Sequence, residues 1–136
     1  MSSPTVIALT GLIAWALALL VLMEILRSRL VLSRQIEANQ FRPDNSNLSP
    51  FMQRLARAHA NCIEGLPIFG GLLLVALVTN RADVTDQLAL VMLAARIFQS
   101  TVHLASLGNT AVTVRFMAFA VQMGIAVYWS WRLLVG

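Results

Sequence analysis

Four ionisable side chains lie inside long apolar stretches of this sequence, and they are its first candidates for chemistry. They are Glu64, Arg96, His103 and Arg115. An ionisable group within a bilayer is costly, so such residues usually face the interior of a helix bundle or a polar cavity. Because two of the four are arginines and only Glu64 is an acid, a cavity that they share has an excess of positive charge. Such a cavity suits an anionic ligand that also carries an ammonium group.

Three of these charges lie at similar depths if the apolar stretches are consecutive antiparallel helices. Glu64 lies roughly 10 Å into its helix, Arg96 roughly 15 Å before the end of the next helix, and Arg115 roughly 7.5 Å into the last one. All three distances are measured from the same end of the bundle. The charges therefore meet in one half of the membrane.

Glu64 also belongs to a polar stripe on one face of its helix. At about 100° per residue, an arc of about 80° holds Arg54, Arg57, Asn61 and Glu64. Two interpretations stay open. The stripe lines a ligand cavity, or Arg54 and Arg57 only anchor the helix at the membrane surface and Glu64 pairs with Arg96 within the bundle. The further cation at Arg115 favours the cavity, because one embedded acid cannot neutralise both embedded arginines.

The composition is that of a membrane protein. Of the 136 residues, 58% are hydrophobic and 12% are charged, and the mean hydropathy is +0.75. Long apolar stretches fill most of the length and leave no room for a separate soluble catalytic domain, a nucleotide-binding fold or a zinc module. One cysteine, Cys62, excludes an intramolecular disulfide and a cysteine-based metal cluster, and no metal site is predicted. We predict a single membrane-embedded domain over residues 1–136.

The apolar stretches predict an all-α fold, an integral membrane four-helix bundle. The expected spans cover residues 6–26, 58–78, 88–107 and 111–134. Each is long enough to cross a hydrocarbon core of about 30 Å at 1.5 Å per residue. Residues 27–57 form the one sizeable loop, ordered between helical extensions. The connections at 79–87 and 106–110 are short, so consecutive helices are expected to be antiparallel neighbours.

The charge distribution predicts the orientation in the membrane. All ten basic residues are arginine, and with six acids they give a net charge of +4. Nucleic-acid binding is excluded as an explanation, because the arginines are sparse and no groove-reading motif is present. Six of the arginines lie in the loop 27–57, which the positive-inside rule places in the cytoplasm. Both termini are then non-cytoplasmic, and the embedded charges lie near the cytoplasmic side.

The segment RLARAHANCIEGLP, residues 54–67, resembles the signature of the MAPEG family, the membrane-associated proteins in eicosanoid and glutathione metabolism. The positions that match are Arg54, Arg57, Asn61, Glu64 and Pro67. Two weaker matches are the pair Ala95–Arg96 in the third span and Arg115 near the start of the fourth. Together with the length and the four spans, the resemblance covers essentially the whole chain. The chain resembles a microsomal-glutathione-transferase-like member of the family.

The resemblance implies a left-handed four-helix bundle that assembles as a homotrimer, with glutathione bound between adjacent subunits in the cytoplasmic half of the membrane. By analogy, three arginines would hold the carboxylates of glutathione: Arg54, Arg57 and Arg96. Asn61 would hydrogen-bond its peptide portion, and Glu64 would take its ammonium group. Membrane lipids and further copies of the chain are the other implied partners.

The same resemblance implies a catalytic role for Arg115. A guanidinium beside the thiol of glutathione, the co-substrate, favours the thiolate and raises its nucleophilic fraction at neutral pH. The implied activity is that of a transferase or peroxidase, in which the thiolate attacks an apolar electrophile or a lipid hydroperoxide that arrives from the bilayer.

The sequence departs from the family pattern at several positions. Gln99 and His103 stand in the third helix where family enzymes often have tyrosines, although both side chains can still hydrogen-bond glutathione. Phe116 and Phe119 stand near Arg115 where many members carry hydroxyl groups. Arg27, at the cytoplasmic end of the first helix, could reach the glutathione of the neighbouring subunit, or it could serve only as a positive-inside anchor.

Two other functions remain as alternatives. A catalytically silent relative that binds glutathione or serves in assembly fits the missing tyrosines. A small multidrug transporter also has four spans and an acid on its first helix. Here, however, Glu24 lies at the end of its span beside Arg27, and the embedded excess is cationic, which disfavours the export of cations.

Overall fold

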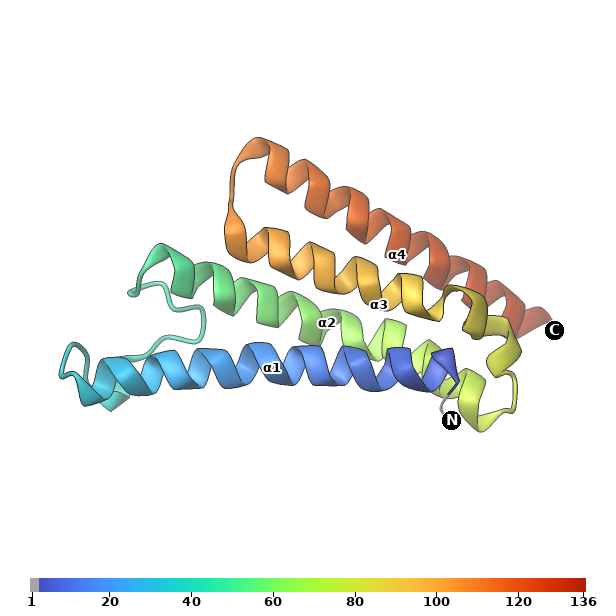
Figure 1. The fold of residues 1–136 in the computed structure, drawn as a ribbon, viewed down its shortest axis with the longest axis horizontal. Coiled ribbons are helices and arrows are strands. Elements are labelled where there is room, and N and C mark those ends of the chain that lie inside the picture. Colours follow the sequence, from blue (N-terminus) through green and yellow to red (C-terminus); the bar gives the residue numbers. More distant parts are fainter. Residues whose placement is uncertain (1–2) are drawn as a thin grey trace.

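The computed structural model describes residues 3–136 and consists of four long helices with one short turn of helix (Figure 1). The elements are α1 (Pro4–Leu32), η1 (Ala38–Gln40), α2 (Pro50–Val78), α3 (Ala82–Ala105) and α4 (Asn109–Val135). All four long helices are apolar and long enough to cross a bilayer. The prediction of an all-α membrane four-helix bundle is confirmed.

Local sequence signals set the ends of α1 and α2. Both helices begin with the pair Ser-Pro: the hydroxyls of Ser3 and Ser49 accept hydrogen bonds from backbone N–H groups in the first turn, and proline follows. Proline is favourable there because its missing N–H has no partner to lose. After the ends of these helices, Arg34 and Asn80 adopt positive φ values of 61° and 57°, which let the chain turn away and satisfy the last carbonyls.

Each helix contains most of its expected span, and α1 and α2 extend into the predicted loop, to Leu32 and from Pro50. The connection predicted at 79–87 is shorter, because α3 already begins at Ala82. Its first turns are polar and carry Asp83, whose negative charge is favourable at a helix N-terminus. Hydropathy marks the part of a helix that crosses the membrane, so it misses turns that extend into the polar region. At its other end α3 stops at Ala105, two residues before the predicted limit at 107.

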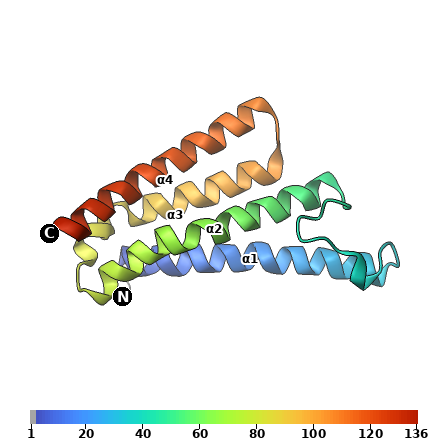
Figure 2. The ribbon, with the colours of Figure 1, turned by 180° about the vertical axis from the view of Figure 1, so that it is seen from behind.

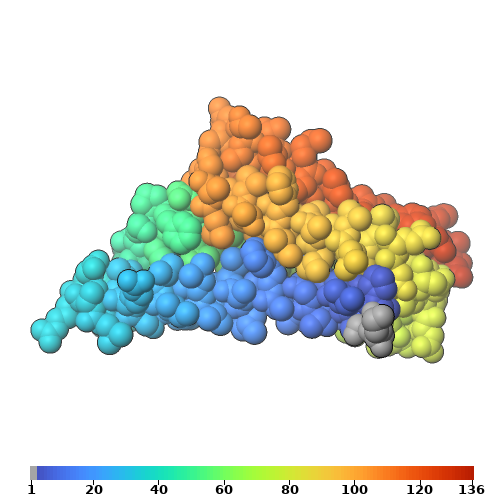
Figure 3. Space-filling view, in the orientation of Figure 1, coloured from blue at the N-terminus to red at the C-terminus, as the bar shows by residue number. Residues whose placement is uncertain are grey.

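The first three helices pack against one another, and α4 packs mainly against α3 (Figure 1). The view from behind in Figure 2 shows the same arrangement, with α4 close to the others at its C-terminal end and separated from α2 at its N-terminal end. The space-filling view in Figure 3 shows the start of α4 standing out from the body. The bundle is therefore tighter at the end that holds both chain termini than at the end predicted to be cytoplasmic.

Two apolar clusters form the interior. One lies toward the end with the termini and is centred on Phe69, Leu73, Met92 and Trp129; the other lies between α1 and α2 and includes Leu19, Met52 and Leu55. Large apolar side chains also cover the outside of every long helix, among them Leu17, Ile68, Phe98 and Val127. An exterior this apolar is what a bilayer requires of the surface that faces lipid.

Polar contacts tie the helices together at the end with the termini. The hydroxyl and the backbone N–H of Thr5 both donate to the Asp86 carboxylate, at 2.6 and 3.1 Å. Arg81 donates to the carbonyl oxygens of Arg132 at 2.8 Å and Leu133 at 3.1 Å, which caps the C-terminus of α4. These contacts satisfy groups at helix ends that have no partner within their own helix.

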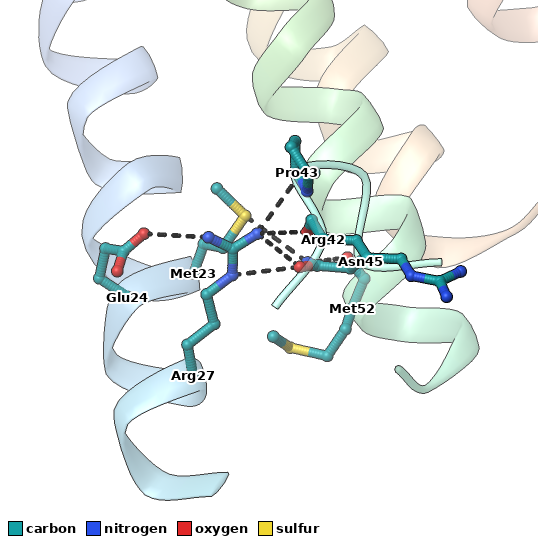
Figure 4. Close-up of polar contacts among 7 residues, drawn as sticks. All are labelled: Met23, Glu24, Arg27, Arg42, Pro43, Asn45 and Met52. Atoms are coloured by element: carbon teal, nitrogen blue, oxygen red, sulfur yellow. Dashed lines mark hydrogen bonds and ion pairs between the residues drawn. The ribbon is translucent and has the colours of Figure 1, made fainter. Parts of the chain in front are cut away.

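The loop between α1 and α2 is held by Asn45 and Arg27 (Figure 4). Arg27 donates to the Asn45 side-chain oxygen from Nε at 3.1 Å and from Nη2 at 2.6 Å, and to the carbonyl oxygen of Arg42 at 3.2 Å. Asn45 in turn donates to the carbonyl oxygen of Met52 at 2.7 Å. Asn45 is fully buried with φ at 55°, a conformation that asparagine tolerates better than most residues. We call Arg27, Asn45 and Met52 the loop clamp.

The loop clamp predicts a large effect for Asn45→Ala. The change removes the hydrogen bonds to Arg27 and Met52 and leaves a residue that disfavours positive φ, so we expect a loss of about 2 kcal/mol or more in unfolding free energy. Thermal unfolding in detergent, followed by circular dichroism, measures it. Asn47→Ala, which removes only an exposed hydrogen bond to the Gln40 carbonyl, is the matched control. Equal shifts for the two variants would contradict the clamp.

Candidate functional site

A cavity of about 240 Å³ lies between α2, α3 and α4. Its walls are formed by Asn61, Glu64, Gly65, Ile68, Phe69, Arg96, Gln99 and Phe119. Four of the residues predicted from the sequence are in this set: Asn61, Glu64, Arg96 and Gln99. The structure thus brings the stripe on α2 together with the arginine on α3.

Larger cavities of about 590 and 600 Å³ lie around the end of α1 and the α1–α2 loop. The first has Arg29 as its one charged wall residue, and the second has Arg27 and Glu24, which already pair with each other at 3.5 Å. Size alone therefore does not identify the site. The smaller cavity is the candidate because it gathers buried and unpaired polar groups.

Arg96 is the central feature of this cavity. Its side chain is 3% exposed, and its guanidinium carbon lies 5.5 Å from the ring centre of Phe69 and 5.9 Å from that of Phe119. Within residues 3–136, its Nη2 is buried without any hydrogen-bond partner. Buried polar groups almost always have partners, and an unpaired buried charge is strongly unfavourable. The buried guanidinium group of Arg96 therefore has free N–H donors that an anion could accept from.

Gly65 makes this position of Arg96 possible. A Cβ atom at residue 65 would lie 2.7 Å from Nη2 of Arg96 and about 3 Å from the edge of the Phe69 ring. Any other residue there would have to displace the guanidinium group or the ring. The glycine therefore leaves the space that the guanidinium group of Arg96 occupies beside the Phe69 ring.

Glu64 is exposed on α2 and lies in the wall of the cavity. The ion pair between Glu24 and Arg27 is the one salt bridge found in the described part of the chain, so Glu64 forms none with Arg96. The structure therefore does not contain the alternative arrangement, in which Glu64 and Arg96 neutralise each other inside the bundle. Both charges are available to a ligand, one for an anion and one for a cation.

His103 lies buried between α2 and α3 next to the cavity. It is 3% exposed, and its Nδ1 lies 3.5 Å from the side-chain nitrogen of Asn61. The positive charges of Arg54, Arg57 and Arg115 all act on its imidazole ring. His103 is thus packed inside the bundle, within a cationic cluster that it forms with these three arginines of α2 and α4.

The arginines of the stripe have different surroundings. Nε of Arg54 donates to the carbonyl oxygen of Leu104 at 2.9 Å, which satisfies a carbonyl in the last turn of α3, and its guanidinium group lies 5.9 Å from the Phe51 ring centre. Arg57 is exposed. Arg54 therefore ties α2 to α3, while Arg57 is free to reach a ligand.

Arg115 and Arg27 lie outside the cavity wall. Arg115 is half-buried near the start of α4, and its Nε has no hydrogen-bond partner among residues 3–136. It belongs to the cationic cluster around His103. Arg27 is held in the loop clamp, where Nε and Nη2 are both engaged. Within this one chain, the structure does not bring Arg27 to the cavity.

Gln122 is a polar residue of the site that the sequence analysis missed. It lies on α4, is fully buried, and donates to the Gln99 side-chain oxygen at 2.8 Å. A signal was present, because Gln122 is an amide inside a predicted span and stands seven residues after Arg115, on the same helix face. Gln122 is uncharged, so the criterion of an embedded charge, which selects Arg115 on the same helix, does not select it.

The arrangement can bind a ligand that carries both signs of charge. A desolvated guanidinium group forms strong hydrogen bonds with a carboxylate, and two phenyl rings hold it in place. Glu64 can accept from an ammonium group, and Asn61 and Gln99 add amide groups for a peptide-like portion. The cavity holds about 240 Å³, below the usual range of about 300–1,000 Å³ for small-molecule sites, so one chain encloses such a ligand only in part.

Comparison with known proteins agrees with these observations. The sequence model of the MAPEG family matches residues 5–135, nearly the whole chain. No curated protein and no solved structure matches the chain. With the family match and four helices that can each cross a bilayer, the chain is an integral multi-pass membrane protein that belongs to the MAPEG family.

Proposed function

We propose that the protein binds glutathione at the cavity between α2, α3 and α4 and activates its thiol for attack on apolar electrophiles or lipid hydroperoxides. The observation that carries this proposal is Arg96, a buried cation with an unpartnered nitrogen in the wall of a cavity that Glu64 also lines. Glutathione has two carboxylates and one ammonium group, which match this pattern of charges. Membership of the MAPEG family supports the same ligand.

The proposed contacts follow from the surroundings of each residue. Arg96 and the exposed Arg57 hold carboxylates of glutathione, and Arg54 on α2 contributes the guanidinium nitrogens that its bond to the end of α3 leaves free. Glu64 accepts hydrogen bonds from the ammonium group. Asn61, Gln99 and His103 contact the peptide portion.

Arg115 is the proposed catalytic residue. In this proposal a ligand that extends out of the cavity, toward the start of α4 and the cationic cluster around His103, brings its thiol to Arg115. A nearby guanidinium group stabilises the thiolate, which is the nucleophile. The apolar outside of α4 at Phe116 and Met117 gives a lipid-soluble electrophile direct access from the bilayer.

A homotrimer is part of the proposal. The cavity of one chain encloses only part of a tripeptide, and the start of α4 lies away from α2 (Figure 2). A neighbouring subunit would complete the site, and its end of α1 would bring Arg27 nearer to the ligand. We propose the orientation with the α1–α2 loop in the cytoplasm, since that loop holds six arginines.

Titration of glutathione into detergent-solubilised protein by calorimetry tests the proposal, with thiolate absorbance followed in the same samples. Saturable binding with a thiolate signal supports the transferase. Binding without a thiolate signal supports the alternative of a catalytically silent relative. This alternative is the second candidate because Phe116 and Phe119 stand where hydroxyl residues would be expected. No binding overturns both and restores the transporter interpretation.

Glu64→Gln is expected to weaken glutathione binding by about tenfold, because a neutral amide replaces the charged partner of the ammonium group. Asp83→Asn, which removes an exposed acid at the opposite end of the bundle, is the control and is expected to leave affinity unchanged. Calorimetry with an analogue that lacks the ammonium group completes the test. If Glu64→Gln weakens binding of the analogue as strongly as binding of glutathione, the contact between Glu64 and the ammonium group is wrong.

A further inference from the structure

Gln122 forms the one side-chain hydrogen bond between α3 and α4 that the described residues contain. Its Nε2 donates to the side-chain oxygen of Gln99 at 2.8 Å and to the backbone carbonyl oxygen of Ala118 at 3.1 Å. Gln122 is fully buried, and Gln99 is 9% exposed. Gln99 lies in the wall of the cavity, whereas Gln122 stands behind it.

The backbone carbonyl of Ala118 fixes the direction of both amides. A carbonyl oxygen can only accept, so the end of the Gln122 amide beside it must be the nitrogen. The second hydrogen of that nitrogen then requires the oxygen of Gln99, and the Gln99 nitrogen is left on the far side. A glutamine without such a neighbour could rotate its amide and present either group.

The consequence concerns what the cavity offers to a ligand. Among residues 3–136, the Gln99 nitrogen has no hydrogen-bond acceptor. We propose that Gln122 is a positioning residue, which holds Gln99 with its N–H groups directed to the cavity as donors to a carboxylate or carbonyl oxygen of the ligand. For the identity of that ligand, this inference rests on the proposed binding of glutathione.

A purely structural role explains less of the geometry. Polar pairs do tie transmembrane helices together, and typical pairs contribute modestly. Here, however, the side-chain oxygen of Gln122 is buried without a partner in the described chain, which is unfavourable in a bilayer. An apolar residue would pack at this position without leaving such a group. The side-chain oxygen of Gln122 lacks a partner because the side-chain nitrogen faces both acceptors, the Gln99 oxygen and the Ala118 carbonyl.

A double-mutant cycle tests the inference. Gln122→Met is expected to weaken glutathione binding by about tenfold, because Gln99 loses its fixed orientation. In the background of Gln99→Met, the same change is expected to alter affinity by less than about twofold, since no amide remains to be positioned. Gln87→Met, at an exposed position of α3, is the control for the loss of a glutamine. Equal weakening in both backgrounds, or lower thermal stability with unchanged affinity, overturns the inference.

A second readout does not depend on glutathione. In protein labelled with ¹⁵N at its six glutamines, the side-chain amide protons of Gln122 should exchange slowly with solvent, and the Gln99 amide signals should shift in Gln122→Met. If wild-type protein fails to bind glutathione, the proposed function fails, and this spectrum alone decides the inference. Unchanged Gln99 signals in the variant contradict it.

Discussion

Arg96→Met is expected to abolish most glutathione binding and, at the same time, to raise the thermal stability of the protein without ligand. The two effects have one cause. Arg96 is 3% exposed, its Nη2 has no partner within residues 3–136, and no acid of that region forms an ion pair with it. Methionine has a similar length, can pack against the same two phenyl rings, and has no charge to desolvate.

The magnitudes follow from the behaviour of buried charges. Removing one partner of a buried pair typically costs about 3–5 kcal/mol, so we expect affinity for glutathione to fall by about a hundredfold or more. Replacing an unpaired buried charge by an apolar group instead stabilises the fold, so the melting temperature of the apo protein should rise by several degrees. Saturating glutathione should then stabilise wild-type protein strongly and the variant hardly at all.

Arg81→Met is the control with the reverse pattern. Arg81 donates to two carbonyl oxygens at the end of α4, far from the cavity along the bundle, so its loss should lower the melting temperature and leave glutathione affinity intact. Calorimetry and thermal unfolding in the same detergent measure both quantities. If Arg96→Met lowers the melting temperature of the apo protein as Arg81→Met does, Arg96 is a structural residue and not a prepared anion site.

The sequence predicted those parts of the site that follow from helix geometry. Residues on one helix face stay together once the helix forms, so the neighbourhood of Asn61 and Glu64 could be predicted from their spacing. The depth argument placed Arg96 opposite them, since antiparallel helices joined by short connections must align. The family resemblance rested on the same residues, and the family match over residues 5–135 confirms it.

Other features depend on tertiary contacts that spacing does not encode. The hydrogen bonds of Arg27 in the loop clamp require the conformation of Asn45, a loop residue with positive φ. The role of Gln122 requires a carbonyl of its own helix and an amide of the next. The packing of α4 mainly against α3, with its start away from α2, is a further tertiary feature about which hydropathy carries no information.

Arg115→Ala is expected to separate chemistry from binding. The residue lies outside the cavity wall, and its Nε has no partner in the described chain, so its loss should weaken glutathione binding by less than about threefold. The thiolate, in contrast, loses its nearby cation. A charged hydrogen bond contributes about 1.5–3 kcal/mol, so the thiolate signal and kcat for conjugation should fall by about tenfold to a hundredfold.

Two other variants test whether Arg115 acts on the thiol while Glu64 acts on binding. Glu64→Gln should raise KM and leave the thiolate signal of the saturated protein intact, because the ammonium group is remote from the thiol. Arg132→Ala removes an exposed arginine that donates to the Tyr128 hydroxyl at the opposite end of α4 and should change neither quantity. A restored thiolate signal at higher pH in Arg115→Ala would show that the cation acts on thiol ionisation. Loss of binding equal to that in Glu64→Gln would place Arg115 among the binding residues instead.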